Sequence, residues 1–229
     1  MIRKPQYIIV AGINGAGKST LYDTRPTLFD KTKRINADEI LKQRGGDWRK
    51  DRDNFKAMRE EIKQLHAALD HGQSIHVETT LAGQGKAQLN LIDCAHKNGF
   101  EVTLLYVAVQ DVNVAIERVQ ARVEKGGHGI PDEVVKKRYS QSSHNLPAVA
   151  FKVDNVVIYD NSQKFVEVYK RNHDRVIKNK LSEYPWINPK INFEAAIQKQ
   201  LNGFVKDNPD LKIEKPMNDA ENKNDRPNY

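Results

Sequence analysis

The chain has 229 residues, of which 38% are hydrophobic and 29% charged, and a formal net charge of +7. This length predicts one domain, or one domain with an appendage. A single cysteine, Cys94, excludes an internal disulfide and a cysteine-rich metal site, and its predicted helical position favours a small core residue over a nucleophile. The apolar runs are far shorter than the roughly 20 residues of a membrane span, and the N-terminus lacks a secretory pattern. We therefore expect a cytoplasmic protein without membrane contact.

The positive charge is weak support for an anionic partner. Much of it lies in segments such as 136–138 and 169–180, where solvated helix faces explain it more simply. Aromatic residues do not alternate with these basic residues as a nucleic-acid surface would favour. Nucleic acid is therefore the less favoured partner.

Five β-rich apolar runs alternate with helical patterns along the first 160 residues. The runs are 7–11, 32–37, 74–78, 102–107 and 155–160. One helix is predicted over 53–71 by the spacing of Phe55, Met58, Ile62, Leu65 and Leu69, and Gly72 ends it. Another begins at Asp111 as N-cap, with Val112, Ile116, Val119 and Val123 on its buried stripe. This order predicts an α/β fold, a parallel sheet with helices on both faces.

The pattern changes after residue 161. The stretch 165–180 reads as a strongly basic helix, and Phe193, Ile197, Leu201 and Phe204 predict one more amphipathic helix. From residue 206 the chain is rich in Asn, Asp, Lys and Pro, which predicts disorder. We thus expect a domain over 1–205 and a polar tail over 206–229.

A glycine-rich motif follows the first predicted strand. Gly12, four further residues and then Gly17-Lys18-Ser19 match the Walker A pattern G-x-x-x-x-G-K-S/T, between a strand and a helix. Glycines let successive backbone N–H groups turn toward a phosphate, and the helix N-terminus adds positive potential. Lys18 would hold β- and γ-phosphate charge, and the Ser19 hydroxyl would bind Mg²⁺. The predicted nucleotide-binding residues are Gly12, Asn14, Gly15, Ala16, Gly17, Lys18, Ser19, Thr20 and Arg118.

The motifs of two other P-loop classes are missing. A GTPase would need N-K-x-D after a strand, and the sequence NKLS at 179–182 lacks the aspartate. A motor ATPase would need an apolar strand ending in Asp, whereas the third predicted strand ends at Glu78. A carboxylate there could serve Mg²⁺ or an acceptor, which favours a small kinase.

Asp38 is the candidate catalytic base. It follows the second predicted strand, and the carboxyl ends of parallel strands are where α/β sheets bind ligands. Its carboxylate could take the proton of an acceptor hydroxyl. The alternative is that Asp38 only caps the following helix, in which Glu39 is a first-turn partner of the helix dipole.

Arginines could supply the positive charge that phosphoryl transfer needs. Arg118 and Arg122 lie four residues apart on one predicted helix face. The glycines of 126–129, Pro131 and a helix carrying Arg138 predict a mobile lid over 124–140 that brings arginines to the phosphates. His128 in this lid is either a substrate contact or a loop residue without that role. The remaining histidines lack metal-ligand spacing, so we predict no transition-metal site.

The ordered set AGINGAGKST, NADEI, ETTLAG, RVQARVEKGGHGIP, KRY and YDNS resembles the zeta toxin family of bacterial P-loop kinases, in its shorter single-domain branch. The likeness covers about residues 6–165. It implies a nucleotide-kinase-like sheet, ATP and Mg²⁺, and transfer to a sugar hydroxyl of UDP-N-acetylglucosamine, a reaction that a small antitoxin protein blocks in this family.

By this resemblance Lys18 matches the Walker lysine and Asp38 the base. Glu78 and Thr79 match the strand end near acceptor and metal, and Arg122 and Arg138 match the two lid arginines, with Arg118 as a substitute for either. The chain is shorter than the founding toxins and lacks their longer acceptor-binding region, so other nucleotides or metabolites stay open as acceptors. A polynucleotide kinase and a non-catalytic nucleotide-binding switch also stay open.

Overall fold

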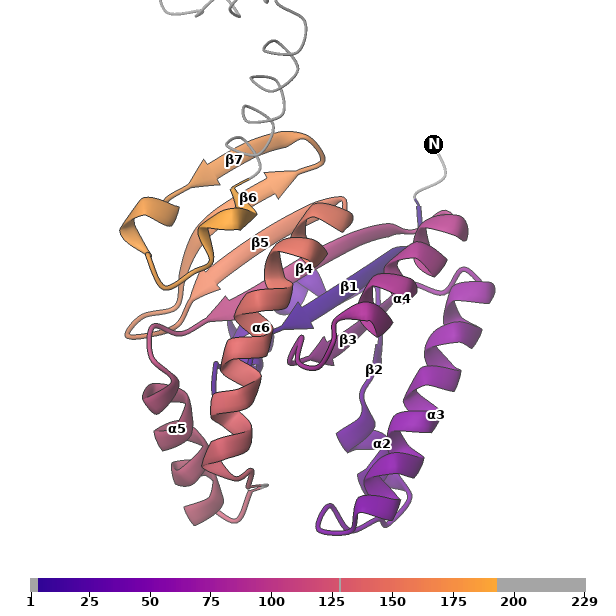
Figure 1. The fold of residues 1–229 in the computed structure, drawn as a ribbon. Coiled ribbons are helices and arrows are strands. Elements are labelled where there is room, and N and C mark those ends of the chain that lie inside the picture. The colour runs from indigo at the N-terminus through magenta and orange to yellow at the C-terminus, as the bar shows by residue number, and fades with distance from the viewer. Residues whose placement is uncertain (1–3, 128, 193–229) are drawn as a thin grey trace, which may run out of the picture. The chain divides into compact units, whose positions relative to one another are not determined.

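The computed structural model describes residues 4–127 and 129–192. The predicted amphipathic helix around 193–204 and the predicted tail 206–229 lie outside this part of the chain, and so does His128. One seven-stranded sheet forms the centre, in the order β2-β3-β1-β4-β5-β6-β7 (Figure 1). The strands are β1 Gln6–Ala11, β2 Lys33–Ile35, β3 Ile75–Thr79, β4 Glu101–Ala108, β5 Asn155–Asp160, β6 Val166–Asn172 and β7 Arg175–Asn179.

The five strands β1 to β5 are mutually parallel, which confirms the predicted α/β class. The helices between them are α1 Lys18–Thr24, α2 Ala37–Gln43, α3 Asp51–Asp70, α4 Lys86–Lys97, α5 Val112–Glu124 and α6 Asp132–Lys152. In β1, Tyr7 and Ile9 join a core cluster with residues of α3, α4 and α6, whereas Ile8 and Val10 join a second cluster with residues of α1 and α5. A central strand covered on both faces explains why its sequence is apolar without alternation.

The predicted basic helix over 165–180 is wrong. This stretch is the hairpin β6–β7, which extends the sheet with two antiparallel strands. Valines at 166 and 168 favour a strand, and His173 has a positive φ of 47° in the turn. Arg171 is buried and donates to the carbonyls of Ala150 (2.6 Å) and Val153 (2.8 Å) at the end of α6. Part of the basic charge is therefore structural.

The helix α3 confirms the predicted helix, but its buried face differs from the predicted spacing. Phe55, Met58 and Ile62 are 70%, 51% and 50% exposed. The inward stripe is instead Ala57, Glu61, Leu65, Ala68 and Leu69, of which all but the half-buried Glu61 are buried. The first half of α3 packs on α2 through a small separate cluster of Ile40, Leu41 and Ala57. Periodicity thus identified the helix and the buried Leu65 and Leu69, but not the residues that pack in the first half of α3.

Two smaller predictions concern α5 and the membrane. Asp111 is the N-cap of α5, as predicted, and its carboxylate accepts from the Asn113 amide at 2.9 Å. Ile116 and Val119 are buried, but Val123 is 46% exposed at the end of this helix. Within the described residues, no helix has the length and apolar character needed to cross a membrane.

Candidate active site

The glycine loop connects β1 to α1 at the carboxyl edge of the sheet. Gly15 and Gly17 have positive φ values of 79° and 99°. A Cβ at Gly15 would lie 2.2 Å from the Ala115 carbonyl oxygen, and one at Gly17 would lie 2.1 Å from the side-chain nitrogen of Asn161. The positive φ therefore favours glycine at both positions, and at Gly15 the neighbouring backbone also leaves no room for a Cβ. The loop has the context that the sequence predicted, a strand before it and a helix starting at Lys18.

Lys18 places its ammonium group inside this loop. Nζ donates to the carbonyl oxygens of Gly12 (2.8 Å) and Ile13 (3.4 Å). Burial lowers the pKa of Lys18, while the nearby carboxylates of Glu78 and Asp38 oppose that shift. The ammonium group thus sits in a site that already favours a compensating anion.

The carboxyl ends of three adjacent strands meet around a large cavity. The order β2-β3-β1 brings the residues after β2, the end of β3 and the glycine loop side by side. The cavity has a volume of about 760 Å³, within the roughly 300–1,000 Å³ of small-molecule sites. Its lining includes Asn14, Gly15, Gly17, Lys18, Ser19, Thr20, Asp38, Glu78, Thr79, Arg118 and Arg122. Most predicted site residues therefore share one space.

Asp38 lies in the first turn of α2, and the helix is capped by its neighbour Asn36. The Asn36 side chain accepts from the amides of Asp38 (2.9 Å) and Glu39 (3.1 Å), so the N-cap alternative for Asp38 is wrong. Within residues 4–127 and 129–192, no donor reaches the Asp38 carboxylate. This carboxylate is exposed and lines the cavity, which leaves its oxygens free to contact a ligand.

Glu78 near the end of β3 is held by side chains from the neighbouring strand β2 and from the residue that caps α2. Arg34 forms an ion pair with Glu78 and a second one with Glu39 at 2.7 Å. The Asn36 amide also approaches Glu78, at 3.5 Å. Glu78 is therefore already paired with a cation, in contrast to Asp38.

The three predicted arginines reach the loop or the cavity. Arg118 donates to the carbonyls of Gly15 (3.5 Å) and Ser162 (3.2 Å). Arg138 donates to the side-chain oxygen of Asn14 at 2.7 Å, and its burial lowers the pKa of its guanidinium. Arg122 is exposed at the cavity wall. Arginines from α5 and α6 thus face α2 across the site.

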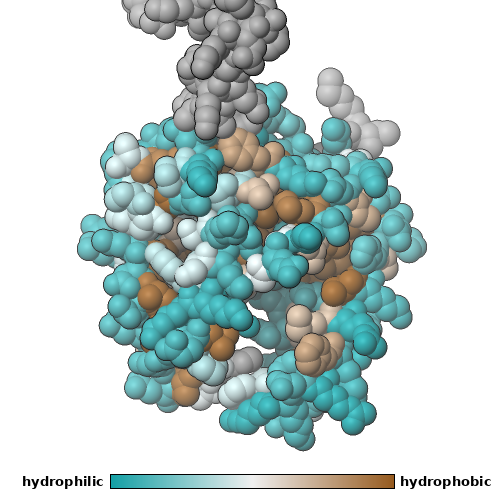
Figure 2. All heavy atoms as spheres, viewed as in Figure 1, coloured by the Kyte–Doolittle hydropathy of each residue, from teal (hydrophilic) through white to brown (hydrophobic). Residues whose placement is uncertain are grey.

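A second, smaller cavity of about 280 Å³ shares Asn14, Ala37, Asp38, Met58 and Arg122 with the large one. Its other lining residues are Leu41, Asn54, Ala57, Ile130 and Arg138. One wall comes from α2 and α3, and the opposite wall from α5 and α6. Figure 2 shows a hollow between these two arms of the molecule. Asp38 stands where the two cavities meet.

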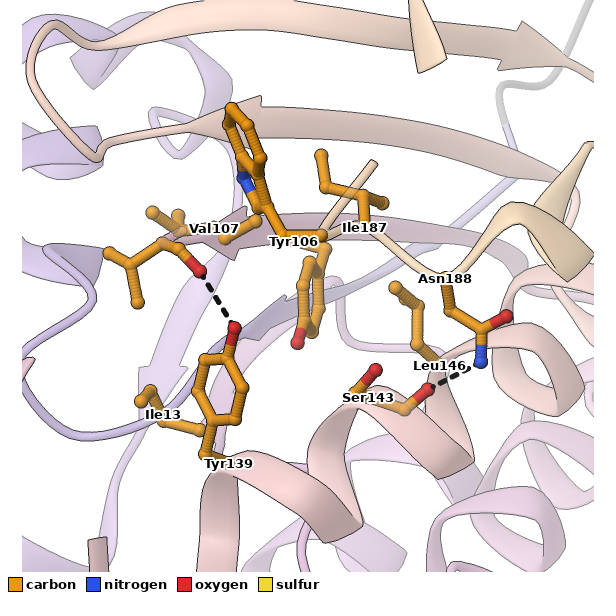
Figure 3. A pocket seen from close by; sticks show the side chains of 11 residues that line it. Ile13, Tyr106, Val107, Tyr139, Ser143, Leu146, Ile187 and Asn188 are labelled. Atoms are coloured by element: carbon orange, nitrogen blue, oxygen red, sulfur yellow. Dashed lines mark hydrogen bonds between the residues drawn. The ribbon is translucent and has the colours of Figure 1, made fainter. Parts of the chain in front are cut away.

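A third space lies behind the glycine loop. It has a volume of about 20 Å³ and is lined by Ile13, Tyr106, Tyr139, Leu146 and Asn188 among others (Figure 3). That volume corresponds to about one water molecule, so it cannot hold a substrate. Tyr139 donates to the Gln110 carbonyl at 3.0 Å and Asn188 to the Ser143 carbonyl at 3.0 Å, which ties α6 to the segment after β4 and to the segment after β7.

The sequence analysis missed several residues that line the site, among them Asn161, Arg34 and Glu61. Asn161 donates to the Ala16 carbonyl at 2.8 Å, Arg34 pairs with Glu78, and Glu61 of α3 lines the large cavity. Asn161 could have been found because it follows β5 at the sheet edge where ligands bind. Glu61 lay between residues of the wrongly chosen helix face, and Arg34 resembles any surface arginine.

The fold and this loop define a P-loop kinase, a phosphotransferase class. The chain belongs to the Zeta toxin family, whose model matches residues 2–174. It is 32% identical over 145 residues to an uncharacterized protein of Haemophilus influenzae. The matched region covers 61% of this chain and 100% of that protein. The predicted family is therefore confirmed.

Two solved structures are similar in fold. The AvrRxo1-ORF1:-ORF2 structure with ATP has a TM-score of 0.67 at 14% identity, over 82% of this chain and 64% of that chain. The PezAT chromosomal toxin–antitoxin system of Streptococcus pneumoniae has a TM-score of 0.55 at 16% identity, over 90% of this chain and 89% of that chain. This chain thus spans 64% of the length of the matched AvrRxo1 chain.

Proposed function

We propose that the protein transfers the γ-phosphoryl group of ATP to a hydroxyl group of a small acceptor, with Asp38 as the general base. The observation that carries this proposal is the unpaired Asp38 carboxylate on the same cavity as Lys18 and the glycine loop. A carboxylate without a hydrogen-bond partner can take the proton of the acceptor hydroxyl as the hydroxyl oxygen attacks the γ-phosphorus and ADP leaves. The similar structure solved with ATP supports the choice of donor.

The glycine loop and the arginines would bind the triphosphate. The backbone amides of Gly15 to Ser19 would hold its β-phosphate, and Lys18 Nζ would give up its contact with the Gly12 carbonyl to neutralise charge on the β- and γ-phosphates. Arg122 and Arg138 neutralise charge on the moving group, since the planar guanidinium fork matches phosphate oxygens. Arg118, which donates to the carbonyls of Gly15 and Ser162 beside the loop, would contact the bound nucleotide.

The side chains on the cavity fit a magnesium ion carried in with the triphosphate. The donors near Lys18 are oxygens of Ser19, Asp38 and Glu78, the hard ligands that Mg²⁺ prefers. When bound, Mg²⁺ would offset charge on the β- and γ-phosphates. Ser19 would hold it. Glu78 is the weaker candidate ligand because its charge is paired with Arg34.

The acceptor would enter from the smaller cavity, with its reacting hydroxyl at Asp38. Leu41, Ala57 and Met58 offer an apolar wall, and Asn54 offers a polar group. Glu78 and Thr79 would contact the acceptor from the end of β3. Membership of the Zeta toxin family favours a UDP-activated sugar such as UDP-N-acetylglucosamine as acceptor, with other nucleotides or metabolites as alternatives.

The test is phosphoryl transfer from labelled ATP to a panel of UDP-sugars, nucleosides and oligonucleotides. We expect a small acceptor to become labelled, and we expect Asp38→Asn to bind ATP as tightly as the wild type while transfer falls roughly 10²- to 10⁴-fold. Transfer at the wild-type rate by Asp38→Asn would show that Asp38 is not the base.

A protein partner is the second part of the proposal. The similar PezAT structure is a toxin–antitoxin system, and this supports a small antitoxin that covers the nucleotide site. Copurification with the product of an adjacent small gene, reversed by excess ATP, would support such a partner. Binding that ATP leaves unchanged would place the partner elsewhere.

A further inference from the structure

The first three backbone N–H groups of α2, those of Ala37, Asp38 and Glu39, each donate to a side-chain oxygen. That of Ala37 donates to a side chain of another helix, α3. The first turn of a helix leaves its N–H groups without intrahelical partners. Asn36 accepts from the amides of Asp38 and Glu39. The remaining amide, that of Ala37, donates to the Glu61 carboxylate on α3 at 3.2 Å.

This contact matters because the Asp38 side chain has no anchor of its own. Within residues 4–127 and 129–192, the Asp38 carboxylate forms no hydrogen bond or ion pair. Its position is therefore set by the backbone of the first turn of α2. That turn is fixed at two points, by Asn36 beside Glu78 on the sheet and by Glu61.

Glu61 is well placed to transmit rigidity from the core. It lies one helical turn before Leu65 on the inward stripe of α3, and Leu65 and Leu69 are buried in the main core cluster. Residues four apart lie above one another on a helix face. Glu61 thus lies one turn beyond the part of α3 that packs in the main core cluster. There its carboxylate accepts the hydrogen bond from the Ala37 amide of α2.

A carboxylate at this position is unfavourable for stability. Burial raises the pKa of Glu61 to about 7, although the Ala37 amide opposes the shift, and the charges of Asp38 and Glu78 raise it further. Tyr7 is a further titratable group near Glu61. An apolar residue here would continue the stripe without this cost, so the polar contact to Ala37 calls for a functional reason.

We propose that Glu61 is a positioning residue: its carboxylate oxygen, by holding the Ala37 amide, fixes the first turn of α2 and thereby aims Asp38 at the transferring phosphoryl group. This inference rests on the proposed role of Asp38 as base. Glu61 acts through Ala37 and does not need to touch the substrate. The proposed role needs an oxygen at this position that accepts the hydrogen bond of the Ala37 amide. Glutamine should therefore preserve the role, and an apolar side chain of the same length should lose it.

The chain contains a matched control one residue away. Glu60 also ties α3 to α2, through an ion pair with Arg44 at 3.1 Å, but at the far end of α2. Glu60→Met removes a contact between the same two helices without touching the first turn. The methionine of Glu61→Met and the glutamine of Glu61→Gln have nearly the same size, but only glutamine keeps an oxygen that can accept the hydrogen bond from Ala37.

The experiment measures kcat and KM for transfer in the full chain with Glu61→Met, Glu61→Gln and Glu60→Met. We expect Glu61→Met to lower kcat about 10- to 100-fold, because small misplacements of a catalytic group cost this much, with KM for ATP within twofold. Glu61→Gln and Glu60→Met should keep kcat within about threefold. Equal losses in Glu61→Met and Glu61→Gln, or in Glu61→Met and Glu60→Met, would overturn the proposal.

A structural measurement separates this inference from the proposed function. Amide hydrogen exchange at Ala37 should be faster in Glu61→Met than in the wild type and unchanged in Glu61→Gln. If Asp38→Asn abolishes transfer while Glu61→Met leaves kcat and Ala37 exchange unaltered, the positioning role fails and the base assignment stands. If Asp38→Asn transfers normally but Ala37 exchange responds as expected, the contact is real and the proposed function fails.

Discussion

The two sides of the active site are built in different ways. The glycine loop is one continuous stretch of sequence, and neighbours hold it from several directions: Arg118 and Asn161 bind its carbonyls, and Arg138 binds Asn14. The α2–α3 arm carries Asp38 on a short helix with its own small core of Ile40, Leu41 and Ala57, and few side chains tie its first turn to the rest. The phosphate side is thus rigid, and the side that carries the base depends on a few polar contacts.

The largest expected difference between the two regions concerns two glycines with positive φ. Gly15→Ala would place a methyl group 2.2 Å from a backbone oxygen that cannot move away, whereas a Cβ at Gly45, in the turn after α2, meets nothing within 4 Å. We expect Gly15→Ala to abolish ATP binding, measured by calorimetry. Gly45→Ala should cost only about 1 kcal/mol of folding stability, from its φ of 64°. Equal effects would show that the loop is not the more constrained region.

Lys18 offers a test of the phosphate side alone. Lys18→Ala removes the ammonium group from the loop, and we expect transfer to fall roughly 10²- to 10³-fold, as for removal of one charge-stabilising donor. The melting temperature should stay the same or rise, because burial disfavours the charged form of Lys18. A large loss of stability would mean that Lys18 holds the fold through Gly12 and Ile13.

Two helix caps sharpen the comparison at a smaller scale. Asn36 is the N-cap of α2, the helix that carries Asp38, and Asp111 is the N-cap of α5. Each alanine substitution should cost about 1 kcal/mol of stability. Only Asn36→Ala should also lower kcat, by about tenfold, since it releases the amide of Asp38. Matching kcat values in the two variants would show that the first turn of α2 keeps its position without the cap.

The same contrast explains what the sequence could predict. The glycine loop was predictable because its spacing, its strand and its helix are local, and the alternation of strands and helices indicated the parallel sheet. The contact that holds the first turn of α2 was not, since Glu61 comes from α3, which only the fold brings beside Ala37. Arg34 and Asn36 are close to Asp38 in the sequence, but their contacts with Glu78 also depend on the fold. The hairpin β6–β7 was taken for a helix because its charges hid the strand-forming valines.

The smallest effect concerns the pH dependence of stability, and it probes the α2–α3 arm directly. The folded protein keeps the Glu61 proton up to about pH 7, whereas an unfolded chain releases it near the ordinary pKa of 4.5. The folded state therefore binds more protons between these values, and its stability falls as the pH rises through them.

Glu61→Gln removes this titration and keeps the acceptor for the Ala37 amide. Relative to the wild type, its free energy of unfolding should rise by about 1 kcal/mol between pH 4.5 and pH 7.5, a figure reduced for the partial exposure of Glu61. Urea denaturation at several pH values measures it, with Glu60→Gln as the control that should show no such gain. A difference that does not change with pH would mean that Glu61 ionises in the folded protein as freely as in water, and the arm would then hold its base without any cost in stability.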